Sequence, residues 1–101
     1  MANVTKKDLV DQVSQRTGLN QLDTKLVVET FLDAVGKSLQ GGRNIEIRGF
    51  GRFKVKQQKA HKARNPRTNE SVLVDERYKP TFEASNKLRD RVSDAIMSKK
   101  N

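Results

Sequence analysis

Apolar residues near the start of the chain recur with the spacing of an amphipathic helix. Thr5 followed three residues later by Asp8 resembles a capping box, in which the hydroxyl and the carboxylate accept hydrogen bonds from free N–H groups. A narrow apolar stripe follows, formed by Leu9, Val10 and Val13. Gly18 suits the left-handed conformation that ends many helices. The pattern predicts a helix over about residues 5–17.

A second helix is predicted from Asn20, where Asp23 repeats the start signal, to about Leu39. At about 100° per residue its apolar side chains spread over roughly 160° of arc, with Leu22 and Leu26 beyond that arc. The arc is formed by Val27, Val28, Phe31, Leu32, Ala34, Val35 and Leu39. One neighbouring element covers less than this, so we infer that the helix is covered by its own chain and by a twofold mate. Burial of the whole helix within one chain is the alternative.

The pattern changes to strict alternation after the second helix. Ile45 and Ile47 alternate with polar neighbours, which is typical of a half-buried strand. The segment Gly49-Phe50-Gly51 interrupts the alternation, because its glycines permit a turn or bulge while the phenylalanine points into the core. In the strand that follows, Phe53 and Val55 share one face. The opposite face is cationic and consists of Arg52, Lys54 and Lys56.

Between Lys59 and Asn69 the sequence holds no large apolar residue, so we expect a basic two-stranded ribbon that is mobile when unbound. Asn65-Pro66 and Thr68-Asn69 favour turns and place the tip of this ribbon. A return strand is predicted from residues of one parity, which are Val72, Val74, Tyr78, Pro80 and Phe82. A last helix is predicted over about residues 84–97, with an apolar stripe of Leu88, Val92, Ala95 and Ile96.

Charge is distributed unevenly along the 101 residues, whose formal net charge is +9. Residues 1–42 carry equal numbers of acidic and basic groups, whereas residues 43–83 carry eleven basic against five acidic groups. No carboxylate interrupts a run of seven basic residues, which are Arg52, Lys54, Lys56, Lys59, Lys62, Arg64 and Arg67. Such a run favours a polyanionic partner, because like charges repel one another in its absence. The alternative is a solvated hairpin that only raises solubility.

Composition argues against several kinds of chemistry. The chain has no cysteine, so it offers neither a disulfide nor a thiolate ligand. Its single histidine, His61, has no acidic partners at metal-ligand spacing and is expected to be an exposed residue of the ribbon. We therefore predict no metal, no cofactor, no small-molecule substrate and no enzymatic activity. The sequence has no apolar run of membrane-spanning length, which predicts a cytoplasmic protein with no membrane partner.

Two motifs in this order of elements resemble the bacterial HU/IHF family of histone-like, DNA-bending proteins. The first is Gly49-Phe50-Gly51-Arg52-Phe53, which matches the family's Gly-Phe-Gly-x-Phe. The second is Arg64-Asn65-Pro66-Arg67-Thr68, which matches its arm-tip Arg-Asn-Pro-x-Thr. Pro80-x-Phe82 matches the return strand, and the likeness covers about residues 4–92.

The resemblance implies an α+β fold that forms an intertwined dimer, with a helical base, a three-stranded antiparallel sheet and protruding β-ribbon arms. It implies one domain over residues 1–101, divided into a helical dimerisation part (1–42), a sheet with the DNA-binding arm (43–83), and a C-terminal helix and tail (84–101). The core of this homodimer or heterodimer is expected from Val27, Phe31, Val35, Leu39, Phe50, Phe53 and Phe82. The three sheet phenylalanines have inward parity, so we interpret them as core and not as platforms for stacked bases.

Double-stranded DNA is the partner that the resemblance implies, with the arms lying in its minor groove. The residues expected to bind DNA are Arg52, Lys54, Lys56, Lys59, Lys62, Arg64, Asn65, Pro66, Arg67, Lys87 and Arg89. The resemblance also implies that Pro66 intercalates between base pairs. Its flat apolar ring agrees with this role, because it has no donor that needs a partner; a plain turn proline is the alternative. The chain departs from the family at Asn69, where glycine is common, and at Ala84-Ser85, where Pro-Gly is usual. It also has Glu83 and Asn86 where lysines are frequent.

The function predicted from these observations is that of a nucleoid-associated protein. It would bind double-stranded DNA with low sequence specificity, bend it by proline wedging and compact the chromosome. Two alternatives stay open. The chain is one subunit of a site-specific IHF-like bending factor, or it is a small basic protein that binds RNA.

Overall fold

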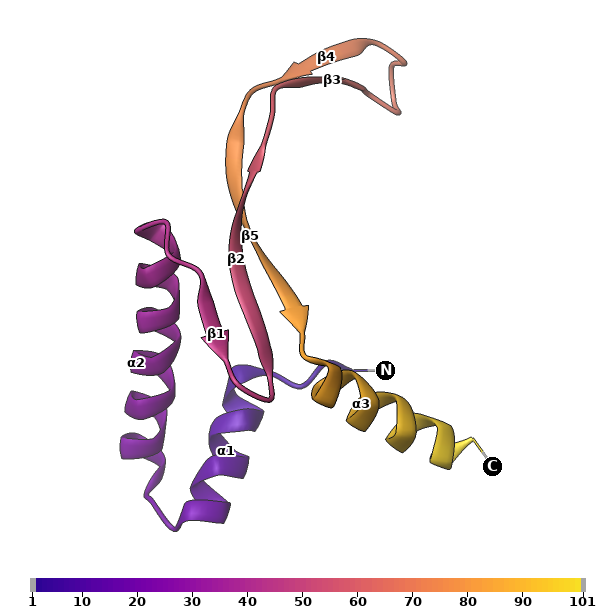
Figure 1. Cartoon of the computed structure of the whole chain (residues 1–101). Helices are drawn as coiled ribbons and strands as arrows, with labels where there is room; N and C mark the ends of the chain where they lie inside the picture. The colour runs from indigo at the N-terminus through magenta and orange to yellow at the C-terminus, as the bar shows by residue number, and fades with distance from the viewer. Residues whose placement is uncertain (1, 101) are drawn as a thin grey trace. The chain divides into compact units, whose positions relative to one another are not determined.

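The computed structural model describes residues 2–100, which form helices and antiparallel strands in an α+β arrangement (Figure 1). The order along the chain is α1 (Lys6–Thr17), α2 (Gln21–Gln40), β1 (Ile45–Ile47), β2 (Gly51–Gln58), β3 (His61–Arg64), β4 (Ser71–Val74), β5 (Arg77–Ala84) and α3 (Asn86–Lys99). The chain divides between Lys37 and Ser38 into a helical unit and a sheet unit, and the elements of each unit are described in turn.

Local hydrogen bonds fix the ends of the first helix, as the sequence predicts. The Thr5 N–H donates to Asp8 Oδ2 at 3.0 Å, and the Asp8 N–H donates to Thr5 Oγ1 at 3.2 Å, which completes a capping box. The backbone hydrogen bond from Thr5 lowers the pKa of the Asp8 carboxyl, with a smaller contribution from the Thr5 hydroxyl. At the other end Gly18 takes the left-handed conformation with φ 80°.

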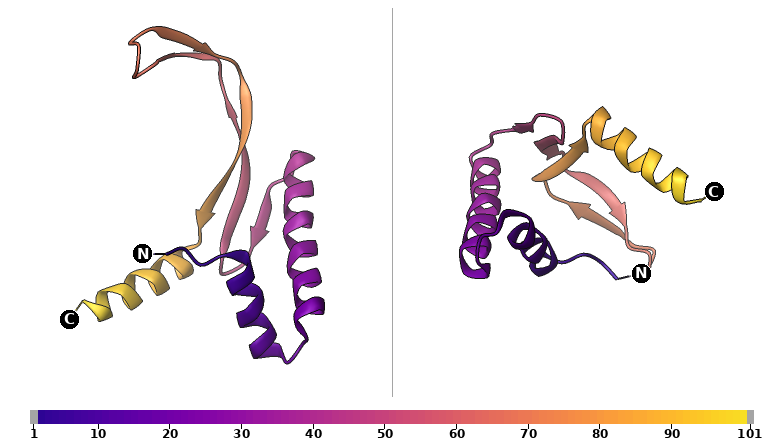
Figure 2. Two further views of the ribbon diagram at one scale, coloured as in Figure 1. Left: turned by 180° about the vertical axis from the view of Figure 1, so that it is seen from behind. Right: turned by 90° about the horizontal axis from the view of Figure 1, so that it is seen from below.

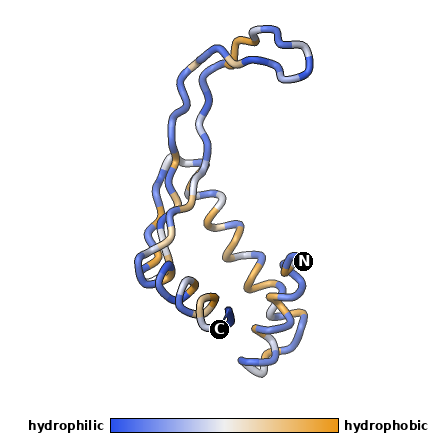
Figure 3. Tube along the Cα trace, turned by 90° about the vertical axis from the view of Figure 1, so that its right-hand side faces the viewer, coloured by the Kyte–Doolittle hydropathy of each residue, from blue (hydrophilic) through white to orange (hydrophobic). Residues whose placement is uncertain are grey.

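The helical unit buries very little on its own. Among the described residues Val10 is the one apolar side chain in the buried class, at 5 % exposure, and Thr24 is the one buried polar side chain, at 1 %. The Thr24 hydroxyl donates to the Asn20 carbonyl oxygen at 2.8 Å, so its burial leaves no polar group without a partner. Large apolar side chains of α2, Phe31 among them, remain exposed. Figure 3 shows hydrophobic stretches that recur along the helix.

The sheet unit is built on three antiparallel strands in the order β1-β2-β5. Phe53 of β2 pairs with Ile45 on one side and with Phe82 on the other, so these side chains share one face. The Phe82 ring lies 4.9 Å from the Phe53 ring and 5.4 Å from the Phe50 ring, between ring centroids, in tilted arrangements. The sheet therefore has one aromatic face, and polar residues occupy the other.

A two-stranded ribbon, formed by β3 and β4, extends beyond the sheet. His61 pairs with Val74, and Arg64 pairs with Ser71. The ladder is interrupted at residues 59–60 on one side and 75–76 on the other, where neither chain segment is in a strand. The left view in Figure 2 shows the ribbon turning away from the direction of β2 and β5. The two-stranded arm predicted from sequence is present, with an interruption that the sequence did not predict; its mobility stays a prediction.

The last helix begins later than predicted, at Asn86 and not at Ala84. Ala84 pairs with Gly51 as the final residue of β5, and Ser85 is the N-cap, whose hydroxyl oxygen accepts from the Leu88 N–H at 3.1 Å. The Ser85 N–H donates to the Phe50 carbonyl oxygen at 2.9 Å, which ties the start of α3 to the turn between β1 and β2. None of the helices within residues 2–100 is long and apolar enough to span a membrane.

Gly51 is required by close packing of β2 against β5. A Cβ atom at this position would lie 2.6 Å from the Glu83 carbonyl oxygen and 2.6 Å from the Phe82 ring. We expect Gly51→Ala to lower the free energy of unfolding by roughly 1–3 kcal/mol, because the paired strand must move. Gly36→Ala is the matched control, since a Cβ there meets nothing within 4 Å. It should raise stability by up to about 1 kcal/mol through helix propensity. Chemical denaturation measures both; equal effects of the two substitutions would contradict this account.

Candidate nucleic-acid interface

Basic side chains gather on the polar face of the three-stranded sheet. The antiparallel register places paired residues on the same face, so Lys56 lies opposite Lys79, and Gln58 lies opposite Arg77. Arg52 and Lys54 occupy the same face further along β2. We name this set the cationic face; its members are Arg52, Lys54, Lys56, Arg77 and Lys79. Like charges directly opposite one another destabilise a sheet, so this face favours an anionic partner.

Arg77 and Lys79 were not among the residues predicted from sequence to bind a nucleic acid. The sequence contained a signal for them. Arg77 and Lys79 alternate with Tyr78 and Pro80, which were predicted to lie on the apolar face of the return strand, so the two basic residues belong to the opposite face. Only the register shows that these two residues join the basic residues of β2 on one surface. The cationic face is thus broader than the run of charge in the sequence.

Two carboxylates partly neutralise the cationic face at one end. Glu83 Oε2 lies 3.3 Å from Lys54 Nζ, and Glu46 Oε1 lies 3.5 Å from Arg52 Nη2. The hydrogen bond from Lys54, followed by its charge, holds the pKa of the Glu83 carboxyl below its usual range. Glu83 is therefore ionised at neutral pH and forms an ion pair with Lys54.

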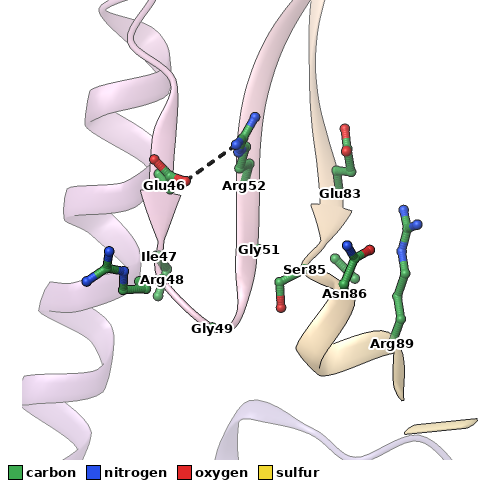
Figure 4. Close-up of a pocket in the computed structure, with 11 residues that line it drawn as sticks. Glu46, Ile47, Arg48, Gly49, Gly51, Arg52, Glu83, Ser85, Asn86 and Arg89 are labelled. Carbon is green, nitrogen blue, oxygen red and sulfur yellow. Dashed lines mark ion pairs between the residues drawn. The ribbon is translucent and has the colours of Figure 1, made fainter. Parts of the chain in front are cut away.

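A polar cavity of about 300 Å³ opens beside the start of α3 (Figure 4). Arg48, Arg52 and Arg89 are among its lining residues, together with Ser85 and Asn86. Figure 4 shows Arg52 turned toward Glu46, as its ion pair requires. The first turn of α3 contains no acidic residue, so the positive end of its dipole is not neutralised within that turn. Of the residues predicted on this helix, Arg89 lines the cavity, whereas the Lys87 stem lies against the Gly49 turn.

The ribbon has two unlike faces. Lys62 and Arg64 of β3 share one face with Leu73 of β4, because Lys62 pairs with Leu73. Ser71, which pairs with Arg64, lies on this face too. The opposite face carries the remaining side chains of the two strands, which are His61, Ala63, Val72 and Val74. Figure 3 shows the ribbon as mainly hydrophilic, with one short hydrophobic stretch. Lys59 lies in the break between β2 and β3, outside both ladders.

The tip of the ribbon is shaped by its own hydrogen bonds. Asn65 Oδ1 accepts from the Arg67 N–H at 2.9 Å, while the Asn65 N–H donates to the Glu70 carbonyl oxygen at 2.9 Å. The Asn69 N–H donates to the Asn65 carbonyl oxygen at 2.7 Å, and Asn69 has φ 63°, a left-handed value that asparagine tolerates better than most residues. Pro66 lies inside this loop, where its lack of an N–H leaves nothing unsatisfied.

The chemistry available on this surface is electrostatic. No group of three or more histidine, cysteine or acidic residues that could hold a metal ion occurs within residues 2–100. What the sheet unit does combine is a cationic face, a basic ribbon and a rigid proline at the ribbon tip. That combination suits a negatively charged polymer, which can follow an extended basic surface over many repeating charges.

Known sequences match most of the length of the chain. A family model described as "Bacterial DNA-binding protein" matches residues 4–93. Integration host factor subunit alpha of Haemophilus influenzae is 39 % identical over 92 residues, which cover 91 % of this chain and 96 % of that protein. The same subunit of Acinetobacter baylyi is 36 % identical over 92 residues, covering 91 % of this chain and 95 % of that protein.

Solved structures give the same comparison in three dimensions. The cocrystal structure of Anabaena HU with DNA matches with a TM-score of 0.81 and 28 % identity, covering 87 % of this chain and 96 % of that one. HU from Thermotoga maritima matches with a TM-score of 0.61 and 25 % identity, covering 87 % of this chain and 97 % of that one.

Proposed function

Since this chain belongs to the bacterial DNA-binding protein family of HU and integration host factor, we propose that it binds double-stranded DNA through its cationic face and ribbon and bends it with low sequence specificity. The family consists of DNA-binding architectural proteins and not of enzymes. One observation supports the proposal most strongly: five basic residues lie on one face of the sheet, and this face continues into a basic ribbon.

The proposed contact surface runs from the start of α3 along β2 and β5 to the ribbon tip. Phosphates are proposed to meet the cationic face, Lys59, Lys62, Arg64 and Arg67, with Lys87 and Arg89 at the helix end. Because these side chains contact the phosphate backbone, they determine the affinity and orientation of the protein on the duplex but recognise little of the base sequence. Asn65 already uses its side-chain oxygen within the tip, so its Nδ2 is the group proposed to donate to DNA.

Pro66 is proposed to wedge between base pairs from the minor groove. Its ring is flat, apolar and held in a loop closed by three hydrogen bonds of Asn65, so insertion buries no unpaired donor. Minor-groove proteins that insert such wedges, HU and IHF among them, kink DNA by roughly 20–90° at an unstacking cost of a few kcal/mol. The bend brings more of the duplex within reach of the basic surface.

A dimer is proposed as the working form. Four of the seven side chains predicted to form its core, Val27, Phe31, Phe50 and Phe82, are exposed in the single chain, and the other three are half-buried. So much exposed apolar surface marks a protein interface. Two copies of this chain can cover this surface as a homodimer, and a related chain can cover the same surface in a heterodimer. Location on the bacterial nucleoid follows from this function.

A competition experiment tests the proposal against its alternatives. The protein is titrated onto a labelled DNA duplex of random sequence, and unlabelled DNA duplex, RNA duplex and single-stranded RNA are each added as competitor. We expect DNA duplex to compete best. Tighter binding to either RNA would overturn the proposal in favour of an RNA-binding role. Footprinting on random genomic fragments distinguishes the remaining alternative, because only a site-specific factor leaves fixed protected positions.

Glu83 is predicted to weaken DNA binding by competing with phosphate for Lys54. Glu83→Gln removes this competitor and should raise duplex affinity by up to about fivefold, the range expected for an exposed ion pair. Fluorescence anisotropy at low salt measures the change. Glu70→Gln is a suitable control, because Glu70 is exposed at the ribbon tip and makes no ion pair within residues 2–100. Equal gains from both variants would show that only net charge matters.

A further inference from the structure

The helical unit carries a second surface, which the proposed DNA contacts do not use. A cavity of about 380 Å³ lies between α1 and α2, and its lining includes Val10 and Leu22. Leu22 is 82 % exposed, and Leu26, one helical turn further along α2, is 65 % exposed. We name the cavity with these two leucines the leucine groove.

The position of the two leucines on α2 separates them from the predicted dimer core. Thr24 marks the inward side of this helix, because it is the one polar residue of the described chain that is buried. Leu22 and Leu26 each stand two residues from Thr24, so each lies about 160° around the helix from it. Coverage of the wide apolar arc by a second protomer therefore leaves these two leucines outside that arc. Their exposure needs a separate explanation.

Lysines outnumber acidic residues in the lining of the cavity. Lys6, Lys7 and Lys25 line it together with one acidic residue, Glu29. Lys6 Nζ lies 3.0 Å from Glu29 Oε1, and this contact lowers the pKa of Glu29. The single carboxylate is thus already paired, and Lys7 and Lys25 carry the remaining positive charge. An apolar centre with a cationic rim is the complement of an amphipathic segment whose polar side is acidic.

We propose that the leucine groove docks an acidic amphipathic helix of a partner protein. One apolar side chain of that helix enters the cavity over Val10, a second rests on Leu26, and its carboxylates face Lys7 and Lys25. The groove would then tie a DNA-bound protein to another protein through residues distinct from those proposed to contact DNA.

Other occupants fit the groove less well. Nucleic acid would leave the two leucines against phosphates, which gain nothing from apolar contact. A second copy of this chain that met the groove with its own groove would bring the same lysines to the contact, so it would meet like charge. An anionic membrane satisfies the lysines but does not need a cavity, so it should bind without filling the space over Val10.

The test uses the full-length protein and a synthetic helix as the probe. The probe is a peptide of about 16 residues with leucines on one face and glutamates on the other, long enough for roughly four helical turns. Amide shifts of the isotope-labelled protein are followed during titration. We expect saturable shifts centred on Val10, Leu22 and Lys25, and we expect a control peptide with lysine in place of glutamate to cause none.

Variants of the protein locate the binding. Leu22→Gln and Leu26→Gln together should reduce peptide affinity by about tenfold or more, because both apolar anchors are lost while the charge of the groove is unchanged. Val4→Gln is the matched control, since Val4 is also exposed in this unit but does not line the cavity. DNA binding by both variants verifies that they fold.

Three results would overturn the proposal. The first is the absence of saturable shifts at about millimolar peptide. The second is equal affinity of the leucine variant and the wild type. The third is the same set of shifts caused by DNA duplex, by anionic vesicles or by raising the concentration of the protein itself, each of which would assign the groove to a different occupant.

Discussion

The affinity of the protein for duplex DNA is expected to fall by roughly 10³- to 10⁵-fold when salt rises from about 50 to about 200 mM. This range applies if about six to ten phosphates are neutralised, because binding releases the counterions condensed on each of them. The cationic face and the basic ribbon together offer enough lysine and arginine side chains for that number. Electrostatics therefore dominates the binding free energy in this account.

Equilibrium titrations at a series of salt concentrations measure the slope of log affinity against log salt. The variant in which Lys56→Ala and Lys79→Ala are combined removes two facing charges and should reduce the magnitude of the slope by about 1.8. Lys37→Ala is the control, because Lys37 belongs to α2, pairs with Asp33 at 3.2 Å and is not among the residues proposed to contact DNA. A nearly flat salt response of the wild type would contradict the electrostatic mechanism. An unchanged slope in the double variant would remove these two residues from the interface.

Replacing Phe82 by alanine is expected to lower the free energy of unfolding by about 3–5 kcal/mol. A loss of this size is a large part of the roughly 5–15 kcal/mol that stabilises a typical domain. Phe82 packs on both Phe50 and Phe53, and it is 44 % exposed in the single chain. The full cost of truncation is reached only if a partner protomer covers this face. The prediction therefore tests dimerisation as well as packing.

Denaturation in guanidinium at two protein concentrations measures this effect. For a dimer the unfolding midpoint rises with concentration, since association favours the folded state by mass action. Tyr78→Ala is a matched control on the same face of β5, because Tyr78 is more exposed and is absent from the aromatic cluster. If Phe82→Ala cost no more than Tyr78→Ala, and midpoints did not depend on concentration, the proposed dimer core would be wrong.

Local chemistry made the helical part of the fold predictable from sequence. The capping box of Thr5 and Asp8 and the left-handed Gly18 fix the ends of α1 through hydrogen bonds and backbone geometry that involve near neighbours only. The same holds for the turn at Thr68-Asn69, which was predicted from residue type and in which Asn69 takes a left-handed φ of 63°. Alternation likewise predicted that the apolar residues of β2 lie on one face of the strand and its basic residues on the other.

Features that depend on pairing between distant residues were harder to predict. Arg77 and Lys79 join the cationic face only through the register of β5 with β2, and a shift of one residue would have moved them to the other face. The start of α3 was placed two residues early, because Ala84 favours helix in isolation but completes the ladder with Gly51. The break in the ribbon at residues 59–60 and 75–76 has no signal of its own that we recognised.

Bending of DNA by Pro66 is the central claim, and end-to-end fluorescence transfer on a short duplex tests it most directly. Both ends of the duplex are labelled, and transfer is measured with wild type and with Pro66→Ala at matched saturation and at two salt concentrations. The account predicts that the wild type brings the ends together, and that Pro66→Ala still binds but bends the duplex less. Saturating binding by both proteins without any shortening of the end-to-end distance would contradict it, and would make the ribbons electrostatic clamps only.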